Sequence, residues 1–430
     1  MPDINRQCAY YILRDVEENK SYSNVAANLH INRQRPSSAP FVRELAYGVL
    51  RNKLYLDYII SKYIETAITK LRPPELILLR MGLYQIIYMD SVPEYAAVNE
   101  TVDMAKKLAP GRNSFINAVL REYIRDTSKA ELPNKEDDPI KYLSIKYSYE
   151  DWIVKLWMEE YGREETEAML AAGARTPALS VRVNTIKTSV ENLKDRLSER
   201  GWDISDGKYD DRTFKLKGEG LLRDSLFTHG LFSVQDEAAY EVVRMLGAKP
   251  SETVIDVCAA PGGKTGAIAE DMHNQGELIA IDINNRRMKQ LEEQMDRLDI
   301  TIVKTREWDA THPYSEYLGC ADRVLVDAPC SGLGTVRRKP EIKYKGTGKV
   351  YKSLPTKQLD ILKASSNYVK AGGTLVYSTC TISKRENEDV ANKFLRENPG
   401  FECILMKQLL PNVDLTDGFF ICKMLRKSPI

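Results

Sequence analysis

Residue types that mark several protein classes are scarce in this sequence. Its 430 residues include only four histidines, which are widely spread, and its seven cysteines form no Cys-x-x-Cys pair. Clustered histidine and cysteine ligands for a metal are therefore missing, and an odd number of cysteines does not suit a disulfide framework. We expect a protein without a metal, in the reducing environment of the cytoplasm.

Long apolar runs and a strong net charge are also absent. No stretch of about 18 apolar residues is present, so we expect no transmembrane helix. The N-terminal residues mix both charge signs with apolar residues and lack the layout of a secretory signal. The 62 basic residues nearly balance the 61 acidic ones, which excludes a strongly basic tail but not a local basic patch. We expect a monomer that does not associate with a membrane.

The N-terminal segment, residues 1–126, has the periodicity of helices. Apolar residues recur at helical spacing, as in Ile116, Val119 and Tyr123, and prolines separate the periodic runs. This pattern predicts an all-α bundle. The polar stretch 127–139, which contains two prolines, predicts a linker.

The middle segment, residues 140–233, shows mixed patterns. Residues 152–170 predict one helix. Leu179, Val181 and Val183 alternate with polar residues and predict a strand. A small α+β domain is the expected result.

The C-terminal segment, residues 234–430, alternates short β-branched runs with helical stretches. This rhythm predicts a parallel sheet covered by helices, an α/β Rossmann-like domain. The expected strands are residues 253–257, 277–282, 300–304, 322–328 and 373–378.

A loop of small residues follows the first of these strands. It reads Cys-Ala-Ala-Pro-Gly-Gly-Lys-Thr over residues 258–265, and a helix is expected after it. Small residues let a ligand approach the backbone closely, and open parallel sheets bind ligands where their strands end. A P-loop fits only in its last three positions, because Cys258 stands where the first glycine belongs. The dinucleotide fingerprint Gly-x-Gly-x-x-Gly is absent as well.

Aspartates follow three successive strands of this segment. Asp282 ends the second strand, Asp309 comes after the third and Asp327 closes the fourth. An acid after the second strand is the usual partner of ribose hydroxyls in Rossmann-like sites. One aspartate alone is more typical of a helix cap. Together, at one edge of the sheet, the three predict a site for a nucleotide-like cofactor.

Two cysteines also stand at strand ends. Cys330, in Asp-Ala-Pro-Cys-Ser-Gly, and Cys380, in Ser-Thr-Cys-Thr, each follow a strand, so we expect their sulfur atoms to meet beside the small-residue loop. Cys258 belongs to that loop, and the other cysteines are expected to be inert. A thiolate is a nucleophile, and its addition to carbon 6 of a cytosine makes carbon 5 able to attack a methyl group.

These motifs together resemble the NOL1/NOP2/Sun family of RNA (cytosine-5) methyltransferases. The resemblance implies that Cys380 is the nucleophile, that Cys330 helps to release the product, and that Asp327 contacts the cytosine or the cofactor. It also implies S-adenosylmethionine as the cofactor. The cofactor-binding residues that it implies are Cys258, Ala259, Ala260, Pro261, Gly262, Gly263, Lys264, Asp282, Asp309 and Asp327.

The N-terminal segment is similar to NusB-like RNA-binding domains, in residues 92–100 and 115–121. Within the family, a NusB-like domain before the catalytic domain is typical of methyltransferases of small-subunit (16S) ribosomal RNA, which is therefore the expected partner. The expected domains are a NusB-like domain over 1–126, a linker over 127–139, a middle domain over 140–233 and a catalytic domain over 234–430.

A basic run follows the first strand-end cysteine. The 22 residues from Ser331 to Lys352 include seven lysines or arginines and a single acid, Glu341. A solvated loop is the usual interpretation of such a run, but its position beside a catalytic thiol favours contacts with RNA phosphates. The predicted RNA-binding residues are Arg337, Arg338, Lys339, Lys343 and Lys345. The target base would have to leave its stack to reach Cys380.

Two other functions stay open at this point. The Gly-Lys-Thr end of the small-residue loop is compatible with an NTP-binding enzyme, and the NusB-like part with a non-catalytic RNA-binding protein. Both rank below the methyltransferase, because neither requires two cysteines at strand ends.

Overall fold

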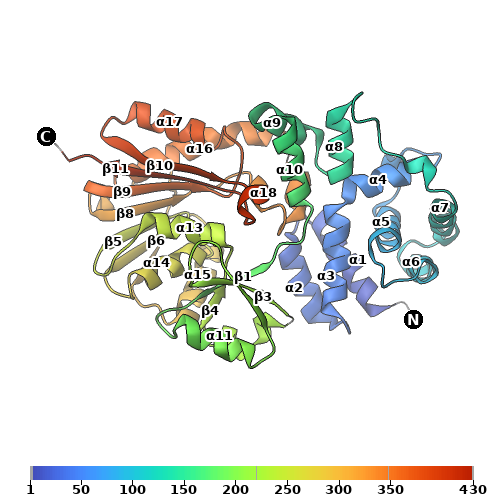
Figure 1. Ribbon diagram of the computed structural model, residues 1–430, viewed down its shortest axis with the longest axis horizontal. Coiled ribbons are helices and arrows are strands. Elements are labelled where there is room, and N and C mark those ends of the chain that lie inside the picture. Colours follow the sequence, from blue (N-terminus) through green and yellow to red (C-terminus); the bar gives the residue numbers. More distant parts are fainter. Residues whose placement is uncertain (1–2, 219, 347, 429–430) are drawn as a thin grey trace. The chain divides into compact units, whose positions relative to one another are not determined.

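The computed structural model describes residues 3–218, 220–346 and 348–428, which form two units (Figure 1). The helical unit comprises Met1–Arg175 and the separate segment Val336–Gly346. The second unit comprises Thr176–Thr335 and Thr347–Ile430. Among the described residues, no helix is both long and apolar enough to cross a membrane.

The helical unit is built from amphipathic helices around one apolar core. Leu45, Leu79 and Leu120, from three different helices, are all fully buried in it. Local signals set the helix ends: the Asp3 carboxylate accepts from two backbone amides of the first turn, and Pro73 starts a helix where its missing N–H costs nothing. The helices are α1 (Ile4–Glu18), α2 (Ser23–Gln34), α3 (Ala39–Arg51), α4 (Lys53–Lys62), α5 (Pro73–Tyr88), α6 (Glu94–Leu108), α7 (Asn113–Arg125), α8 (Pro139–Tyr147), α9 (Asp151–Tyr161) and α10 (Arg163–Gly173).

The single helix predicted over 152–170 is wrong. The structure has two helices there, α9 and α10, because Gly162 adopts a positive φ of 81° that ends the first helix.

The second unit begins with a small antiparallel sheet in the order β2-β3-β1-β4. Its buried side, which includes Val181, Phe214 and Phe232, forms a separate apolar core. The predicted α+β character of the middle segment is confirmed, although only its first strand had been expected and residues 140–175 of that segment belong to the helical unit. The elements are β1 (Leu179–Val183), α11 (Val190–Ser198), β2 (Asp203–Asp206), β3 (Thr213–Lys217), α12 (Ser225–Thr228) and β4 (Phe232–Val234).

A seven-stranded sheet in the order β10-β11-β9-β8-β5-β6-β7 forms the rest of this unit. The five strands from β9 to β7 are parallel, and β11 and β10 add an antiparallel edge. The strands are β5 (Thr253–Val257), β6 (Glu277–Asp282), β7 (Val303–Glu307), β8 (Ala321–Asp327), β9 (Val369–Thr379), β10 (Phe401–Leu409) and β11 (Phe419–Arg426). The α/β prediction is confirmed, and the antiparallel edge is an addition to it.

Helices cover both faces of the large sheet (Figure 1). Residues of α16 and α17, such as Leu362 and Phe394, share one apolar cluster with the sheet. Residues of α13, α14 and α15, such as Val243 and Leu291, share the cluster on the opposite face. The helices are α13 (Glu237–Leu246), α14 (Gly263–Asp271), α15 (Asn285–Leu298), α16 (Gly348–Ser366), α17 (Glu388–Glu397) and α18 (Pro411–Asp414).

Candidate active site

Four parallel strands end at one edge of the large sheet. Val257 at the end of β5 is in register with Ile281 of β6 and Val326 of β8, and Asp327 is in register with Ser378 of β9. The residues that follow these strands therefore lie along a single edge. This edge holds the small-residue loop and both strand-end cysteines.

The loop after β5 has a backbone that only small residues allow. Gly262 has a φ of 98°, and a Cβ added to it would lie 2.8 Å from Cγ of Leu291. The Ala260 amide donates a hydrogen bond to Oδ2 of Asp282 at 3.1 Å, which ties the loop to the end of β6. Helix α14 starts at once, at Gly263. The loop thus brings backbone amides beside the carboxylate of Asp282, which is 22 positions away in the chain.

A buried carboxylate atom next to this loop lacks a protein partner. Asp256 on β5 is fully buried, and its Oδ2 accepts from the Thr265 hydroxyl at 2.7 Å. Its Oδ1 has no hydrogen-bond partner among the described residues. An unpaired buried polar atom is expected where a ligand or a water completes a site. Together with the small-residue loop and Asp282, it fits a nucleotide-like cofactor such as S-adenosylmethionine.

Asp327 is held by two groups at the centre of this edge. Lys264 Nζ donates to its Oδ2 at 2.7 Å, and Ser378 Oγ donates to its Oδ1 at 3.0 Å. Burial alone would lower the pKa of Lys264, but the Asp327 carboxylate, together with Cys380 and Asp256, outweighs burial and raises that pKa. Lys264 therefore stays charged and keeps Asp327 in one orientation. The structure brings both predicted residues together.

Asp309 is placed differently from the other predicted aspartates. It is exposed, and its Oδ1 accepts from both the amide and the hydroxyl of Thr311, at 3.0 and 2.8 Å. These hydrogen bonds lower the pKa of Asp309. They are local to the turn after β7, so the carboxylate serves first as a turn residue there.

The two strand-end cysteines meet, as the sequence predicts. Their sulfur atoms, Sγ of Cys330 and Sγ of Cys380, lie 3.3 Å apart although the residues are 50 positions apart in the chain. Both side chains are partly buried and neither forms a disulfide. The loops that carry them are joined directly by the Ser331 and Thr381 hydroxyls, 2.7 Å apart.

The surroundings of Cys330 and Cys258 raise the pKa values of both thiols. Contact with the Cys380 sulfur, burial, and the charges of Glu386 and Asp327 raise the pKa of Cys330 well above its usual value. Burial, with the nearby Asp282, likewise raises the pKa of Cys258. Cys258 and Cys330 are therefore poor nucleophiles at neutral pH. Among the described residues, no group of histidine, cysteine and acidic side chains is arranged to hold a metal.

Sequence reasoning missed two polar residues that support the cysteines. Glu386 and Asn387 are almost fully buried just before α17, and both contact the cysteine-bearing loops. Their partners come from other strands and helices. The only available signal, two adjacent polar residues shortly after the Cys380 motif, resembles an ordinary helix start.

The predicted RNA contact of Lys343 is wrong in this structure. Lys343 is fully buried in the helical unit, and its ammonium donates to the carbonyls of Arg51 and Tyr147, at 2.8 and 3.3 Å. These residues end helices α3 and α8, whose last carbonyls lack partners within the helix. Burial, together with the charge of Arg51, lowers the pKa of Lys343 well below its usual value, but the side-chain nitrogen still donates to both carbonyls. Lys343 therefore caps two helices instead of facing solvent.

Other basic residues near Lys343 are also packed against the helical unit. Lys345 Nζ donates to the carbonyls of Lys20 and Ser21, at 2.9 and 3.0 Å, and Arg337 is only 9% exposed. Arg338 and Lys339 are half-exposed. The part of the run over Val336–Gly346 is therefore packed in the helical unit instead of forming a solvated loop.

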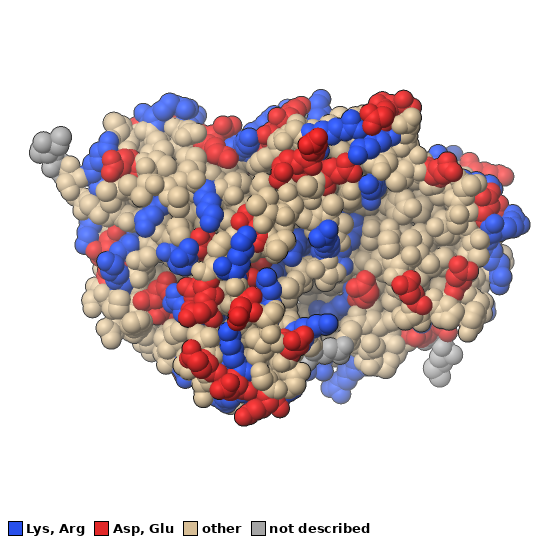
Figure 2. Space-filling model, in the orientation of Figure 1, with Lys and Arg blue, Asp and Glu red and all other residues tan. Residues whose placement is uncertain are grey.

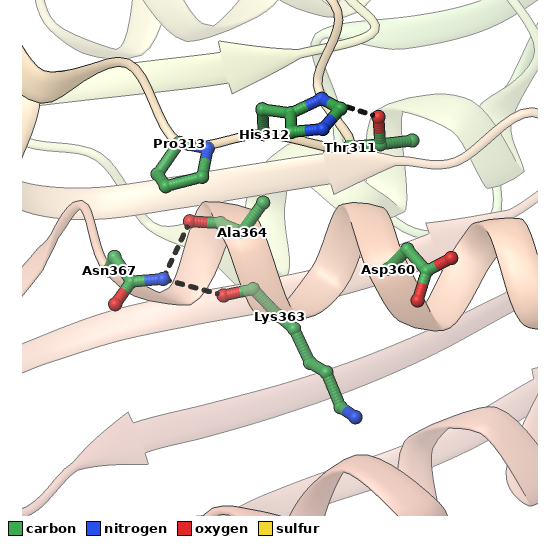
Figure 3. Close-up of a pocket in the computed structure, with 7 residues that line it drawn as sticks. All are labelled: Thr311, His312, Pro313, Asp360, Lys363, Ala364 and Asn367. Carbon is green, nitrogen blue, oxygen red and sulfur yellow. Dashed lines mark hydrogen bonds between the residues drawn. The ribbon is translucent and has the colours of Figure 1, made fainter.

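A surface hollow elsewhere on the second unit contains none of the predicted site residues. A hollow beside α16 is lined by Thr311, His312, Pro313, Asp360, Lys363, Ala364 and Asn367 (Figure 3). Its Asn367 amide donates to two carbonyls of the same helix, and none of the predicted site residues lines it. On the face shown in Figure 2, acidic and basic side chains are interspersed.

Three family models match consecutive parts of the chain. The NusB family model matches residues 3–125, and a model described as the ferredoxin-like domain of RsmF/B-like methyltransferases matches residues 149–220. The model described as 16S rRNA methyltransferase RsmB/F matches residues 243–425. The matches follow the helical, α+β and α/β parts of the fold.

Relatives align along the whole chain. "Probable ribosomal RNA small subunit methyltransferase B" of Bacillus subtilis (strain 168) is 36% identical, over 98% of this chain and 99% of its own. "Ribosomal RNA small subunit methyltransferase B" of Klebsiella pneumoniae is 31% identical, over 99% and 98%.

Solved structures agree with these sequence relatives. The crystal structure of PH0851 matches with a TM-score of 0.85 and 26% identity, over 99% of both chains. NSun6 from Pyrococcus horikoshii, solved with SFG, has a TM-score of 0.58 and 23% identity, and it covers 64% of this chain and 98% of its own. The second likeness supports the fold alone.

Proposed function

Because this chain belongs to the 16S rRNA methyltransferase RsmB/F family, we propose that it methylates carbon 5 of a cytosine in 16S ribosomal RNA through a covalent bond between Cys380 and the base. The family uses S-adenosylmethionine, which supplies an electrophilic methyl group when bound. The small-residue loop over residues 258–264, with Asp282, would hold the cofactor, and Asp309 would border it.

Cys380 starts the reaction in this proposal. Its thiolate adds to carbon 6 of the cytosine, and the displaced electron pair makes carbon 5 nucleophilic. Contact with the Cys380 sulfur and burial raise the pKa of Cys330, so Cys330 keeps its proton beside the nucleophile. Asp327, held by Lys264 and Ser378, presents a fixed carboxylate to the cytosine or to the cofactor.

Cys330 acts at the end of the reaction. Once carbon 5 is methylated, its proton would pass to water, so that the ring double bond re-forms and the Cys380 sulfur leaves. Cys330 keeps its own proton because its pKa is raised, and it would donate that proton to the departing sulfur 3.3 Å away. Without it, the adduct between Cys380 and the base would persist.

RNA would be held partly by the half-exposed Arg338 and Lys339, as phosphate contacts. The target cytosine would be flipped or single-stranded. We also propose a monomer in the cytoplasm, with a NusB-like domain over 1–126 and a catalytic domain over 234–430. Size-exclusion chromatography with light scattering would reveal a dimer and refute the first of these points.

The observation that carries the proposal is the 3.3 Å distance between the sulfurs of Cys330 and Cys380. The test is transfer of a labelled methyl group from S-adenosylmethionine to 16S RNA, followed by digestion to nucleosides. We expect label in 5-methylcytidine, none with Cys380→Ala, and normal transfer with the exposed-cysteine control Cys403→Ala. Label in another nucleoside, or normal transfer by Cys380→Ala, would refute the proposal.

A further inference from the structure

The side chain of Asn387 binds the residues on both sides of Cys380. Its Oδ1 accepts from the Thr379 hydroxyl at 2.6 Å, and its Nδ2 donates to the Thr381 carbonyl at 3.1 Å. The same Nδ2 donates to Oε1 of Gln408, on β10, at 2.7 Å. Asn387 is fully buried, so these contacts are shielded from water. The amide therefore fixes the backbone before and after the proposed nucleophile.

The side chain of Glu386 does the same for the other cysteine. Its Oε2 accepts from the Ser331 amide at 2.9 Å and from Gln358 Nε2 at 2.9 Å. Gln358 Nε2 also donates to the Pro329 carbonyl at 3.1 Å. Pro329 and Ser331 are the neighbours of Cys330 in the chain. Glu386 is only 2% exposed, and Gln358 is fully buried.

The two supports are consecutive residues, so they form one element. The Tyr377 hydroxyl donates to the Glu386 carbonyl at 2.6 Å, which ties this element back to β9. The Gly334 amide donates to the Cys380 carbonyl at 3.0 Å, which adds a direct link between the loops. A single dipeptide therefore holds both loops, in addition to the direct contacts of Ser331 with Thr381 and of Gly334 with Cys380.

We propose that the Glu386–Asn387 dipeptide positions the two cysteines against each other, with Asn387 setting Cys380 for adduct formation and Glu386 setting Cys330 for product release. The assignment of steps rests on the proposed function. The positioning itself does not, because it is a statement about the distance between two sulfurs.

The residue types suit these positions. Asn387 acts as acceptor and donor at once, so a carboxylate in its place would face the Thr381 carbonyl and the Gln408 oxygen without a proton to share. Glu386 uses only acceptor atoms. A glutamine at 386 can keep both hydrogen bonds through its own oxygen, which makes Glu386→Gln a conservative variant and Glu386→Ala a disruptive one.

The first test measures the sulfur separation in the full chain without RNA. A short bifunctional thiol-alkylating reagent is added at alkaline pH, and mass spectrometry counts bridged Cys330–Cys380 peptides. The Asn398→Ala protein, altered at the end of α17 away from both loops, is the control. We expect Glu386→Ala and Asn387→Ala each to reduce the bridge at least about tenfold relative to this control. Unchanged bridging in both variants would overturn the proposal.

The second test separates the steps with S-adenosylmethionine and 16S RNA. Asn387→Ala should slow adduct formation by about thirtyfold, the factor for two hydrogen bonds of ordinary net strength. Glu386→Ala should instead accumulate adduct, and Glu386→Gln should behave nearly as the parent. Equal effects of the two alanine variants on both steps, or a Glu386→Gln variant as impaired as Glu386→Ala, would contradict the positioning roles.

Two further variants guard against simple misfolding. Thr379→Val removes one hydroxyl bonded to Asn387 with little change of shape, and it should slow adduct formation about fivefold. Asn398→Ala removes a side-chain hydrogen bond at the end of α17, away from both loops, and it should change neither step. If Thr379→Val has no effect, Asn387 does not act through the Cys380 backbone.

If the parent protein forms no adduct at all, the proposed function fails. The bridging test still decides whether Glu386 and Asn387 position the two cysteines.

Discussion

Asp256, which is buried beside the small-residue loop, should make the free energy of unfolding depend on pH. The carboxyl is fully buried, with one oxygen bonded to the Thr265 hydroxyl and the other without a partner among the described residues. Burial, helped by the charges of Asp327 and Asp282, raises the pKa of Asp256 from 3.8 to about 7, against the opposing effects of Thr265 and Lys264.

The raised pKa determines the sign of the effect. In the unfolded chain the carboxyl ionises near pH 4, whereas in the folded chain it keeps its proton up to about pH 7. Its contribution to stability is therefore complete below the unfolded pKa and is lost as the pH rises through the folded one. At about 1.36 kcal/mol for each pKa unit, the loss amounts to about 4 kcal/mol.

The variant Asp256→Asn cannot ionise and should escape this loss. Near pH 4 its free energy of unfolding should be close to that of the parent, and by about pH 8 it should be the more stable by up to about 4 kcal/mol. Urea unfolding of both proteins across this pH range measures the difference. Asp195→Asn, at an exposed position of α11, is the matched control and should show no such trend. A difference between Asp256→Asn and the parent that does not change with pH would refute the reasoning.

Three further predictions follow from packing and charge. Lys343→Met should lower the free energy of unfolding of the helical unit, measured in urea, by about 2 kcal/mol, because two helix-end carbonyls lose their donor. It should leave RNA affinity unchanged, and weaker RNA binding at unchanged stability would contradict the capping role. Gly334→Ala should reduce methyl transfer more than about tenfold, since the Cβ added in the loop after Cys330 would lie 2.0 Å from the backbone oxygen of Gly418. Gly400→Ala, with open space around it, should be neutral in the same assay. Lys264→Met should lower the free energy of unfolding by about 2 kcal/mol by leaving Asp327 unpaired, and it should cost much less in an Asp327→Asn background; equal costs in both backgrounds would mean that the pair does not interact.

The sequence predicted best the elements whose structure is decided locally. Residues 253–257 are β-branched and apolar, are followed by small residues, and become β5 as expected. The strand predicted over 300–304 instead lies at Val303–Glu307. The reason is that Ile300 is buried against the end of α15, so the apolar residue that suggested a strand belongs to the helix packing.

Contacts between distant residues were beyond such reasoning. The carbonyl of Arg51 that accepts from Lys343 is 292 positions away in the chain, so a count of charges could not reveal that this lysine is buried. Cys330 and Cys380 are 50 positions apart in the chain, yet their meeting was predictable, because the parallel-strand rule places all such strand ends at one edge. No comparable rule covers Glu386 and Asn387, whose partners depend on how the loops pack.

The central claim is that Cys380 bonds covalently to a cytosine and that the neighbouring Cys330 assists the release of the methylated base. The most direct measurement is mass spectrometry of the Cys330→Ala protein after reaction with S-adenosylmethionine and 16S RNA, then digestion by nuclease and protease. The account predicts a peptide that carries a methylated cytidine nucleotide on Cys380. A Cys330→Ala protein that turns over normally, with the Cys380 peptide always unmodified, would contradict it.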